Sequence, residues 1–246
     1  MLITLWFYFC LILLTVETSI VIVIALYLYP TENYGQKAAI IWGRTLLKLT
    51  GIDLTVQGLE NLKPGQAYIF AANHQSQFDI FVLWACMPRK SYWLIKAELF
   101  SIPILTHALR SMGSLPIDRT NSQTSIASLN KAAQIAKSGS SIVIFPEGTR
   151  GATGQLLPFK KGGFALAIKS GQPIVPVSIS GTRFIQPRGV LRIHPGPVKV
   201  VFGRPIETTP FAPNKKQALM KVVREAMAQN FDPDYPYNAG GKATTT

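Results

Sequence analysis

Residues 69–79 decide the fold, and they read Ile-Phe-Ala-Ala-Asn-His-Gln-Ser-Gln-Phe-Asp. An apolar run, a polar cluster and then an apolar helical pattern from Gln77 predict a strand, a turn and a helix, with Ser76 as the helix N-cap. His74 and Asp79 would lie about 140° apart around one ideal helix. They can therefore meet only if His74 lies in the turn and Asp79 in the first helical turn. Asp79 would then fix the imidazole tautomer and leave the other ring nitrogen as a base.

A second cluster follows another apolar run, in residues 142–150, which read Ile-Val-Ile-Phe-Pro-Glu-Gly-Thr-Arg. Pro146 ends the expected strand, and Gly148 allows a ligand to approach the backbone closely. Thr149 and Arg150 offer hydroxyl and guanidinium donors suited to a phosphate. Taken alone, this cluster could be a tight turn with a surface ion pair. If the two strands run parallel in one sheet, both clusters lie at the carboxyl edge, where such sheets bind ligands.

Strand-like runs alternate with helical patterns along the chain, which predicts an α/β fold with a mostly parallel or mixed sheet flanked by helices. The expected strands cover residues 54–56, 67–72, 92–95, 141–145, 174–179, 190–193 and 198–202. The last two surround a His-Pro-Gly-Pro sequence and are expected to form a hairpin near one edge. The expected helices cover residues 77–87, 104–112, 121–138, 162–170 and 214–230.

The segment from residue 2 to residue 29 is almost entirely apolar, with Glu17 as its one formal charge. It lacks the basic start and small-residue end of a cleavable signal peptide, so we expect a retained membrane anchor. It could be a spanning helix, which needs roughly 20 apolar residues, or a helix or hairpin lying in one leaflet. Residues 33–50 have apolar side chains at helical spacing, which predicts either an amphipathic helix at the membrane surface or a core-facing helix.

The composition differs between an apolar N-terminal segment and a basic remainder of the chain. The 246 residues are 48% hydrophobic and carry a formal net charge of +13. No Lys or Arg precedes Lys37, and the rest of the chain carries 25 basic against 10 acidic residues. This distribution favours anionic partners and places the body on the cytoplasmic side of the anchor. We expect an anchor and amphipathic helix over 1–50, a main domain over 51–237 and a flexible tail over 238–246.

Several common kinds of site are disfavoured by the sequence. It contains no GxSxG, GxxxxGK or GxGxxG pattern and no CxxC pair, and its three histidines are widely separated, so we expect no metal. Two cysteines cannot form a disulfide scaffold and fit a reducing compartment. The basic residues are scattered along the sequence and form no recognisable nucleic-acid-binding motif, which disfavours binding to nucleic acid.

The ordered motifs resemble those of the glycerolipid acyltransferase family. Residues 73–79 resemble the NHxSxxD form of its HxxxxD motif, and residues 145–150 match its FPEGTR motif without change. The intervening and following blocks correspond to residues 96–99 with Pro103, 113–119 and 174–177. The likeness is strongest to bacterial 1-acyl-sn-glycerol-3-phosphate acyltransferases. One departure is Thr106-His107, where a glycine and a large aromatic residue are expected; it leaves the shape of the acyl pocket and the role of His107 open.

This resemblance implies direct acyl transfer from acyl-CoA or acyl carrier protein to the sn-2 hydroxyl of lysophosphatidate, giving phosphatidate without a cofactor. His74 would be the general base and Asp79 would orient it. The acceptor phosphate subsite would comprise Arg119, Glu147, Gly148, Thr149 and Arg150, with Lys96 as a weaker candidate. The expected location is the bacterial inner membrane, with the catalytic domain on the cytoplasmic side. Alternatives are another lysophospholipid or lyso-aminolipid acceptor and, more remotely, a non-enzymatic basic protein that binds membranes or nucleic acid.

Overall fold

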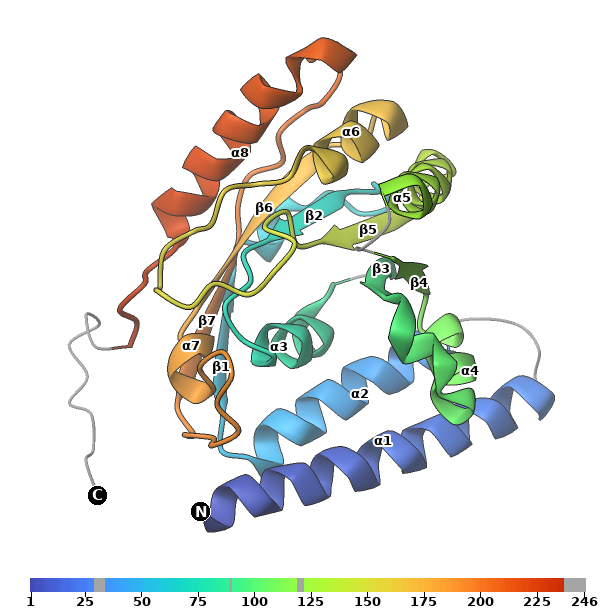
Figure 1. Ribbon diagram of the computed structural model, residues 1–246, viewed down its shortest axis with the longest axis vertical. Helices are drawn as coiled ribbons and strands as arrows, with labels where there is room; N and C mark the ends of the chain where they lie inside the picture. Colours follow the sequence, from blue (N-terminus) through green and yellow to red (C-terminus); the bar gives the residue numbers. More distant parts are fainter. Residues whose placement is uncertain (29–33, 89, 119–121, 237–246) are drawn as a thin grey trace.

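A computed structural model describes residues 1–28, 34–88, 90–118 and 122–236 of the chain. The described strands form one seven-stranded sheet in the order β1-β7-β6-β2-β5-β3-β4 (Figure 1). The β6–β7 pair is antiparallel and the other neighbouring pairs are parallel, which confirms the predicted mixed sheet. The strands are β1 (Asp53–Gln57), β2 (Ile69–Ala72), β3 (Ser91–Lys96), β4 (Ser114–Ile117), β5 (Ser141–Ile144), β6 (Ile174–Ser180) and β7 (Pro197–Phe202).

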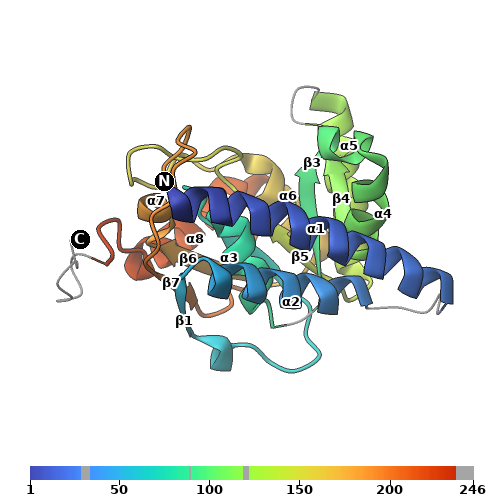
Figure 2. The ribbon, with the colours of Figure 1, turned by 90° about the horizontal axis from the view of Figure 1, so that it is seen from below.

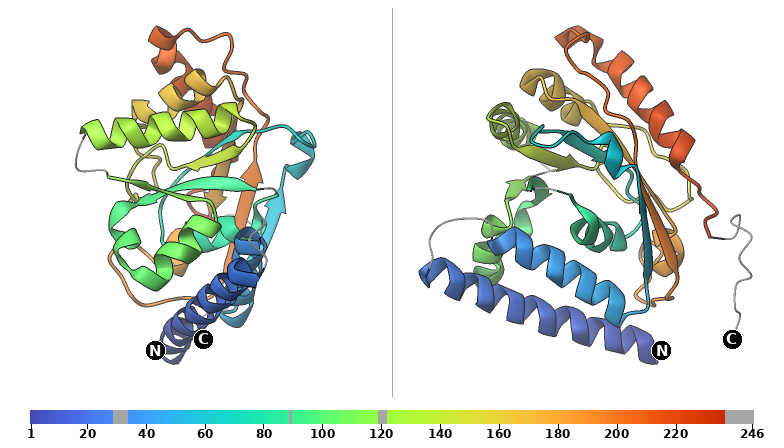
Figure 3. Two further views of the ribbon diagram at one scale, coloured as in Figure 1. Left: turned by 90° about the vertical axis from the view of Figure 1, so that its right-hand side faces the viewer. Right: turned by 180° about the vertical axis from the view of Figure 1, so that it is seen from behind.

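Helices cover both faces of this sheet, as the two further views show (Figure 3). They are α1 (Leu2–Leu28), α2 (Tyr34–Leu49), α3 (Phe78–Cys86), α4 (Pro103–Ser111), α5 (Ser122–Lys137), α6 (Lys161–Ser170), α7 (Thr182–Ile185) and α8 (Lys216–Asn230). Because side chains alternate along a strand, β2 serves both layers. Phe70 and Ala72 join the cluster containing α1, α2 and α3, whereas Ile69 and Ala71 join the one containing α5, α6 and α8. All four residues of β2 are buried, as expected for a central strand.

The apolar helix α1 lies along one side of the molecule next to α2 (Figure 2). Trp6 Nε1 donates to the Leu49 carbonyl at 2.9 Å, and Trp42 Nε1 donates to Thr15 Oγ1 at 3.2 Å. By length and composition α1 could cross a membrane, and only 17% of its most apolar window is buried in the protein. A large apolar surface therefore remains outside the folded body, which is consistent with membrane association.

Helix α2 has one face buried in the protein and one exposed apolar position. Ala39 and Leu46 are fully buried against the rest of the chain. Ile41 is 65% exposed and adds to the apolar surface beside α1. The prediction of a core-facing helix is therefore confirmed, whereas contact of the exposed face with a membrane stays a prediction.

The expected strand over residues 190–193 and its hairpin are wrong. Strand β7 already pairs with β6 on one side and with β1 on the other, so it has no free edge for a further strand. The segment instead contacts α1, where Tyr8 Oη donates to the Leu191 carbonyl and Ile193 N donates to Thr4 Oγ1. Strand β4 and the short helix α7 were not predicted from the sequence. The tail expected over 238–246 lies outside the described residues.

Candidate active site

The two polar clusters meet at the carboxyl edge of the sheet. Strands β2 and β5 are parallel neighbours, with Ile69 opposite Ile142 and Ala71 opposite Ile144, so the loops that follow them begin side by side. The backbone carbonyl of His74 accepts a hydrogen bond from Gly151 N at 2.8 Å, which ties the two loops together. The expectation that both clusters share one edge is confirmed.

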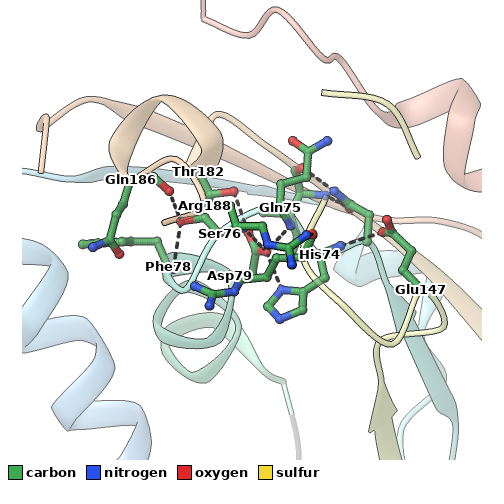
Figure 4. Close-up of polar contacts among 12 residues, drawn as sticks. His74, Gln75, Ser76, Phe78, Asp79, Glu147, Thr182, Gln186 and Arg188 are labelled. Atoms are coloured by element: carbon green, nitrogen blue, oxygen red, sulfur yellow. Dashed lines mark hydrogen bonds and ion pairs between the residues drawn. The ribbon is translucent and has the colours of Figure 1, made fainter. Parts of the chain in front are cut away.

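His74 and Asp79 form a buried hydrogen-bonded pair (Figure 4). His74 Nδ1 lies 2.8 Å from Asp79 Oδ2, which confirms the pairing expected from a turn followed by a helix. The same carboxylate oxygen accepts from Gln75 N at 2.7 Å and from Ser76 N at 2.9 Å. Thr182 Oγ1 donates to the other oxygen, Oδ1, at 2.5 Å. Four donors on a fully buried carboxylate leave it little freedom to rotate.

The start of α3 holds this geometry. Ser76 Oγ accepts from Phe78 N at 3.2 Å and donates to the Gln186 carbonyl at 2.8 Å. The helix begins at Phe78 with Gln77 as its N-cap residue, so the prediction of Ser76 as the N-cap is wrong by one position. Ser76 still binds the first residue of the helix, and it ties the turn to the end of α7. On the other side, the ring of Phe145 stacks on the imidazole of His74, with ring centroids 4.1 Å apart. The imidazole is thus held by both its edge and its face.

Glu147 joins the two loops through backbone groups. Its Oε1 accepts from His74 N at 2.8 Å and its Oε2 accepts from Leu157 N at 2.9 Å. The side chain is 2% exposed, and this burial raises the pKa of the carboxyl group, partly offset by the two N–H donors. Glu147 therefore shapes this edge by positioning His74, because both carboxylate oxygens already accept backbone hydrogen bonds.

Cationic and donor groups surround the loop after β5. Thr149 is exposed, Arg150 is half-buried, and Arg188 Nη1 donates to the Arg150 carbonyl at 2.9 Å. Gly148 has φ +69°, and a Cβ added there would lie 2.8 Å from Cε of Lys160, whose side chain crosses this glycine. The backbone conformation and the close side chain both favour glycine at this position.

Two further residues were predicted for this subsite, Arg119 and Lys96. Arg119 lies outside the described residues, so its position is not part of the site geometry. Lys96 Nζ forms a surface ion pair with Glu98 Oε1 at 2.8 Å, with both side chains 59% exposed. This contact lowers the pKa of Glu98. Lys96 is also one of the residues that line the cavity described next.

A largely apolar cavity of about 340 Å³ opens beside the His74 ring. Its walls include the aromatic side chains of Trp42, Trp84 and Trp93, and α1 contributes Thr15, Thr18 and Ser19. Its volume lies at the lower end of the range of small-molecule pockets. An apolar ligand chain in this cavity would lie next to a polar dyad. Among the residues that the structure describes, no group of three or more His, Cys, Asp or Glu side chains could hold a metal ion.

Sequence reasoning missed the residues that α7 and the following loop bring to the site. Thr182 and Gln186 lie more than 100 positions after the residues they contact, and Arg188 follows in the same segment. One sequence signal could have indicated them. The strand that became β6 was expected in the same sheet, so its carboxyl end could lie at the edge that carries His74.

Comparison with known proteins agrees with the geometry. The acyltransferase family model matches residues 53–180, which is about half of the chain and includes both loops. The chain belongs to the acyltransferase family. The resemblance seen in the sequence motifs is therefore confirmed.

Two curated relatives and one crystal structure are similar to this acyltransferase over much of its length. A protein of Limnanthes alba named 1-acyl-sn-glycerol-3-phosphate acyltransferase is 32% identical over 203 residues, covering 82% of this chain and 72% of that protein. The chloroplastic BAT2 protein of Brassica napus, of the same name, is 37% identical over 153 residues, and the match spans only 44% of its length. The crystal structure of the 1-acyl-sn-glycerophosphate acyltransferase PlsC from Thermotoga maritima superposes with a TM-score of 0.80 at 28% identity, covering 93% of this chain and 94% of that one.

Proposed function

We propose that this acyltransferase transfers a fatty acyl group from acyl-CoA or acyl carrier protein to the sn-2 hydroxyl of lysophosphatidate, giving phosphatidate. The observation that carries the proposal is the 2.8 Å contact between His74 Nδ1 and Asp79 Oδ2 beside an apolar cavity. The relatives named as 1-acyl-sn-glycerol-3-phosphate acyltransferases support the choice of acceptor.

His74 acts as the general base in this proposal. Asp79 favours the tautomer with a proton on Nδ1, so Nε2 takes the proton of the acceptor hydroxyl. The oxygen attacks the thioester carbonyl directly, and the tetrahedral intermediate collapses with loss of the thiolate, which takes the proton back from the imidazolium. Asp79 stabilises the imidazolium while it exists. No covalent acyl-enzyme is required.

The acceptor phosphate binds to the loop after β5. Thr149 supplies a hydroxyl donor, and the guanidinium of Arg150 can donate two parallel hydrogen bonds to phosphate oxygens. Gly148 keeps the loop backbone accessible, and Glu147 holds the loop against His74. Arg119 is a further proposed contact, and Lys96, at the wall of the cavity, is a weaker one.

The apolar elements suit lipid substrates. The cavity beside His74 would take an acyl chain, and α1 would keep the site at the membrane, where both acceptor and product reside. Each CH₂ group transferred into water would cost about 0.8 kcal/mol, so a reaction at the membrane surface avoids a large desorption cost. We propose the bacterial inner membrane as its location. We further propose that the catalytic domain lies on the cytoplasmic side, because basic residues occur only after the anchor.

A thioester-release assay with lysophosphatidate tests the proposal. Membranes containing wild-type protein should release free CoA from acyl-CoA, or free carrier protein from its acyl form, and accumulate phosphatidate. His74→Ala should lower turnover by several orders of magnitude while the protein stays folded. His194→Ala is the matched control, because this exposed histidine lies outside the dyad and should leave turnover unchanged.

An acceptor panel separates the alternatives. Lysophosphatidate should be preferred over a zwitterionic lysophospholipid and a lyso-aminolipid. The proposed guanidinium contacts from Arg119 and Arg150 favour a terminal phosphate monoester. A strong preference for either competitor would replace the acceptor but keep the chemistry. Full function of His74→Ala in cells that depend on this protein would favour a non-enzymatic basic protein instead.

A further inference from the structure

The carboxylate of Asp79 is held from its far side by a residue 103 positions downstream. Asp79 and Thr182 are both fully buried, and Thr182 Oγ1 donates to Asp79 Oδ1 at 2.5 Å. The other three donors converge on Oδ2. Thr182 is therefore the partner of Oδ1 in the described part of the chain.

The backbone around Thr182 places its hydroxyl in this position. Strand β6 is the parallel neighbour of β2, so both strands end at the edge where His74 lies. Gly181 follows β6 with φ +101°, and a Cβ added there would lie 2.5 Å from the Pro197 carbonyl oxygen. A glycine thus permits a sharp turn that places Thr182 against Asp79. A second tie, from Ser76 Oγ to the Gln186 carbonyl at 2.8 Å, holds the same segment to the catalytic turn.

We infer that Thr182 is a positioning residue for acyl transfer: its hydroxyl holds the Asp79 carboxylate so that Oδ2 stays directed at His74 Nδ1. This inference rests on the proposed role of His74 as the base. The hydroxyl touches neither acceptor nor donor, and it acts by preventing rotation of the carboxylate about its Cβ–Cγ bond. Without this hydroxyl, Oδ1 would be buried with no hydrogen-bond donor. The carboxylate would then be free to turn away from the imidazole in search of another donor for Oδ1.

The charged surroundings decide the direction of the pH effect. His74 and, from the loop after β5, Glu147 act on the carboxylate. The charged residue of α7, Arg183, is turned toward the Pro233 carbonyl and Asp234. On the α1 side, Tyr8 Oη accepts a hydrogen bond from Gln186.

Proton uptake changes the charge of the His74–Asp79 pair from −1 to 0. In the neutral state the imidazolium is stabilised by the carboxylate that Thr182 holds in place, so removal of the hydroxyl makes protonation of His74 harder. The fall of kcat/KM at acidic pH should therefore shift to lower pH in a variant that lacks the hydroxyl.

Three variants test the inference. Thr182→Val removes the hydroxyl at nearly constant volume, and Thr182→Ser retains it. Thr50→Val is the matched control, because Thr50 is equally buried and its hydroxyl donates at 2.7 Å to the Leu46 carbonyl instead of to the dyad. Thr182→Val should lower kcat about 10- to 100-fold and leave acceptor KM within about twofold. Thr182→Ser should restore most of kcat, and Thr50→Val should lower only the melting temperature.

A readout that needs no substrate separates this inference from the proposed function. The chain contains three histidines, so ¹⁵N-histidine labelling gives few ring signals, and those of His74 can be assigned by their loss in His74→Asn. In Thr182→Val the pH midpoint of the His74 signals should move downward, whereas those of His107 and His194 should stay unchanged. If lysophosphatidate is not acylated but the midpoint moves, the acceptor is wrong and the positioning role stands. Wild-type kcat and an unmoved midpoint in folded Thr182→Val would overturn it, as would failure of Thr182→Ser to restore activity.

Discussion

Asp79→Asn tests how much the charge of the dyad contributes, because the structure allows this substitution with the hydrogen bonds retained. The amide oxygen can occupy the position of Oδ2 and accept from His74 Nδ1, Gln75 N and Ser76 N. The amide NH₂ would then face Thr182 Oγ1, whose hydroxyl can rotate and accept a hydrogen bond. The imidazole keeps its tautomer and orientation, and only the negative charge is lost.

The expected loss follows from the distance between the charges. An imidazolium at His74 and a carboxylate at Asp79 have charge centres roughly 4 Å apart, which corresponds to about 4 kcal/mol at an effective dielectric constant near 20. This energy is available when the imidazolium forms in the transition state and is absent for the neutral imidazole. We therefore expect kcat to fall about a thousandfold. Acceptor KM should stay within about threefold, because Asp79 is fully buried behind His74.

The assay is steady-state thioester release with lysophosphatidate at saturating donor, with a melting curve for each variant. Asp53→Asn, at an exposed position on β1, controls for the loss of a carboxylate elsewhere. If folded Asp79→Asn retained more than about a tenth of wild-type kcat, the charge of Asp79 would not stabilise the transition state, and the assigned role would be wrong.

Three further substitutions or labels test other parts of the site. Arg150→Ala should raise acceptor KM at least as clearly as it lowers kcat, and an unchanged KM in initial-rate measurements would remove Arg150 from the phosphate subsite. Glu147→Gln should lower the free energy of unfolding at neutral pH by about 1.5–3 kcal/mol, because an amide cannot accept from both N–H groups that Glu147 binds. Burial raises the pKa of Glu147 above 4.5, so just above pH 4.5 the native state binds more protons than the unfolded chain. The free energy of unfolding of the wild type should therefore fall as the pH rises through this window. Denaturant titrations of Glu147→Gln should not show this fall. Burial also raises the pKa of Cys86 to about 12, so a thiol reagent at pH 8 should label it only after denaturation, and rapid labelling of the native protein would contradict the buried position.

The contact between His74 and Asp79 could be predicted from the sequence because its geometry is local. Asp79 lies five positions after His74, and a strand followed by a turn and a helix brings the two side chains together with little help from the rest of the chain. The meeting of the two polar loops required one further assumption, that β2 and β5 are parallel. Their continuous apolar residues made this a reasonable expectation, because strands buried on both faces are typical of parallel sheets.

Other parts depended on partners that a sequence pattern does not name. Residues 190–193 have the composition of a strand, but β7 has both edges occupied, so their backbone groups bind α1 instead. Strand β4 is four residues long and contains Pro116, which weakens a strand pattern. It was therefore missed, although it pairs with β3 at the edge of the sheet.

The sequence by itself determined the apolar first helix, the alternation of strands and helices, and the paired histidine and aspartate, because each arises from neighbours within about ten residues. Tertiary structure alone decided which hydroxyl holds the far oxygen of Asp79, which carboxylate joins the two loops, and that α1 supplies part of the cavity wall. The contacts of Thr182 with Asp79 and of Glu147 with His74 join residues more than 70 positions apart, and the cavity wall combines α1 with residues as distant as Phe145. They form only when the order of the strands has brought the carboxyl ends of β5, β2 and β6 to one edge.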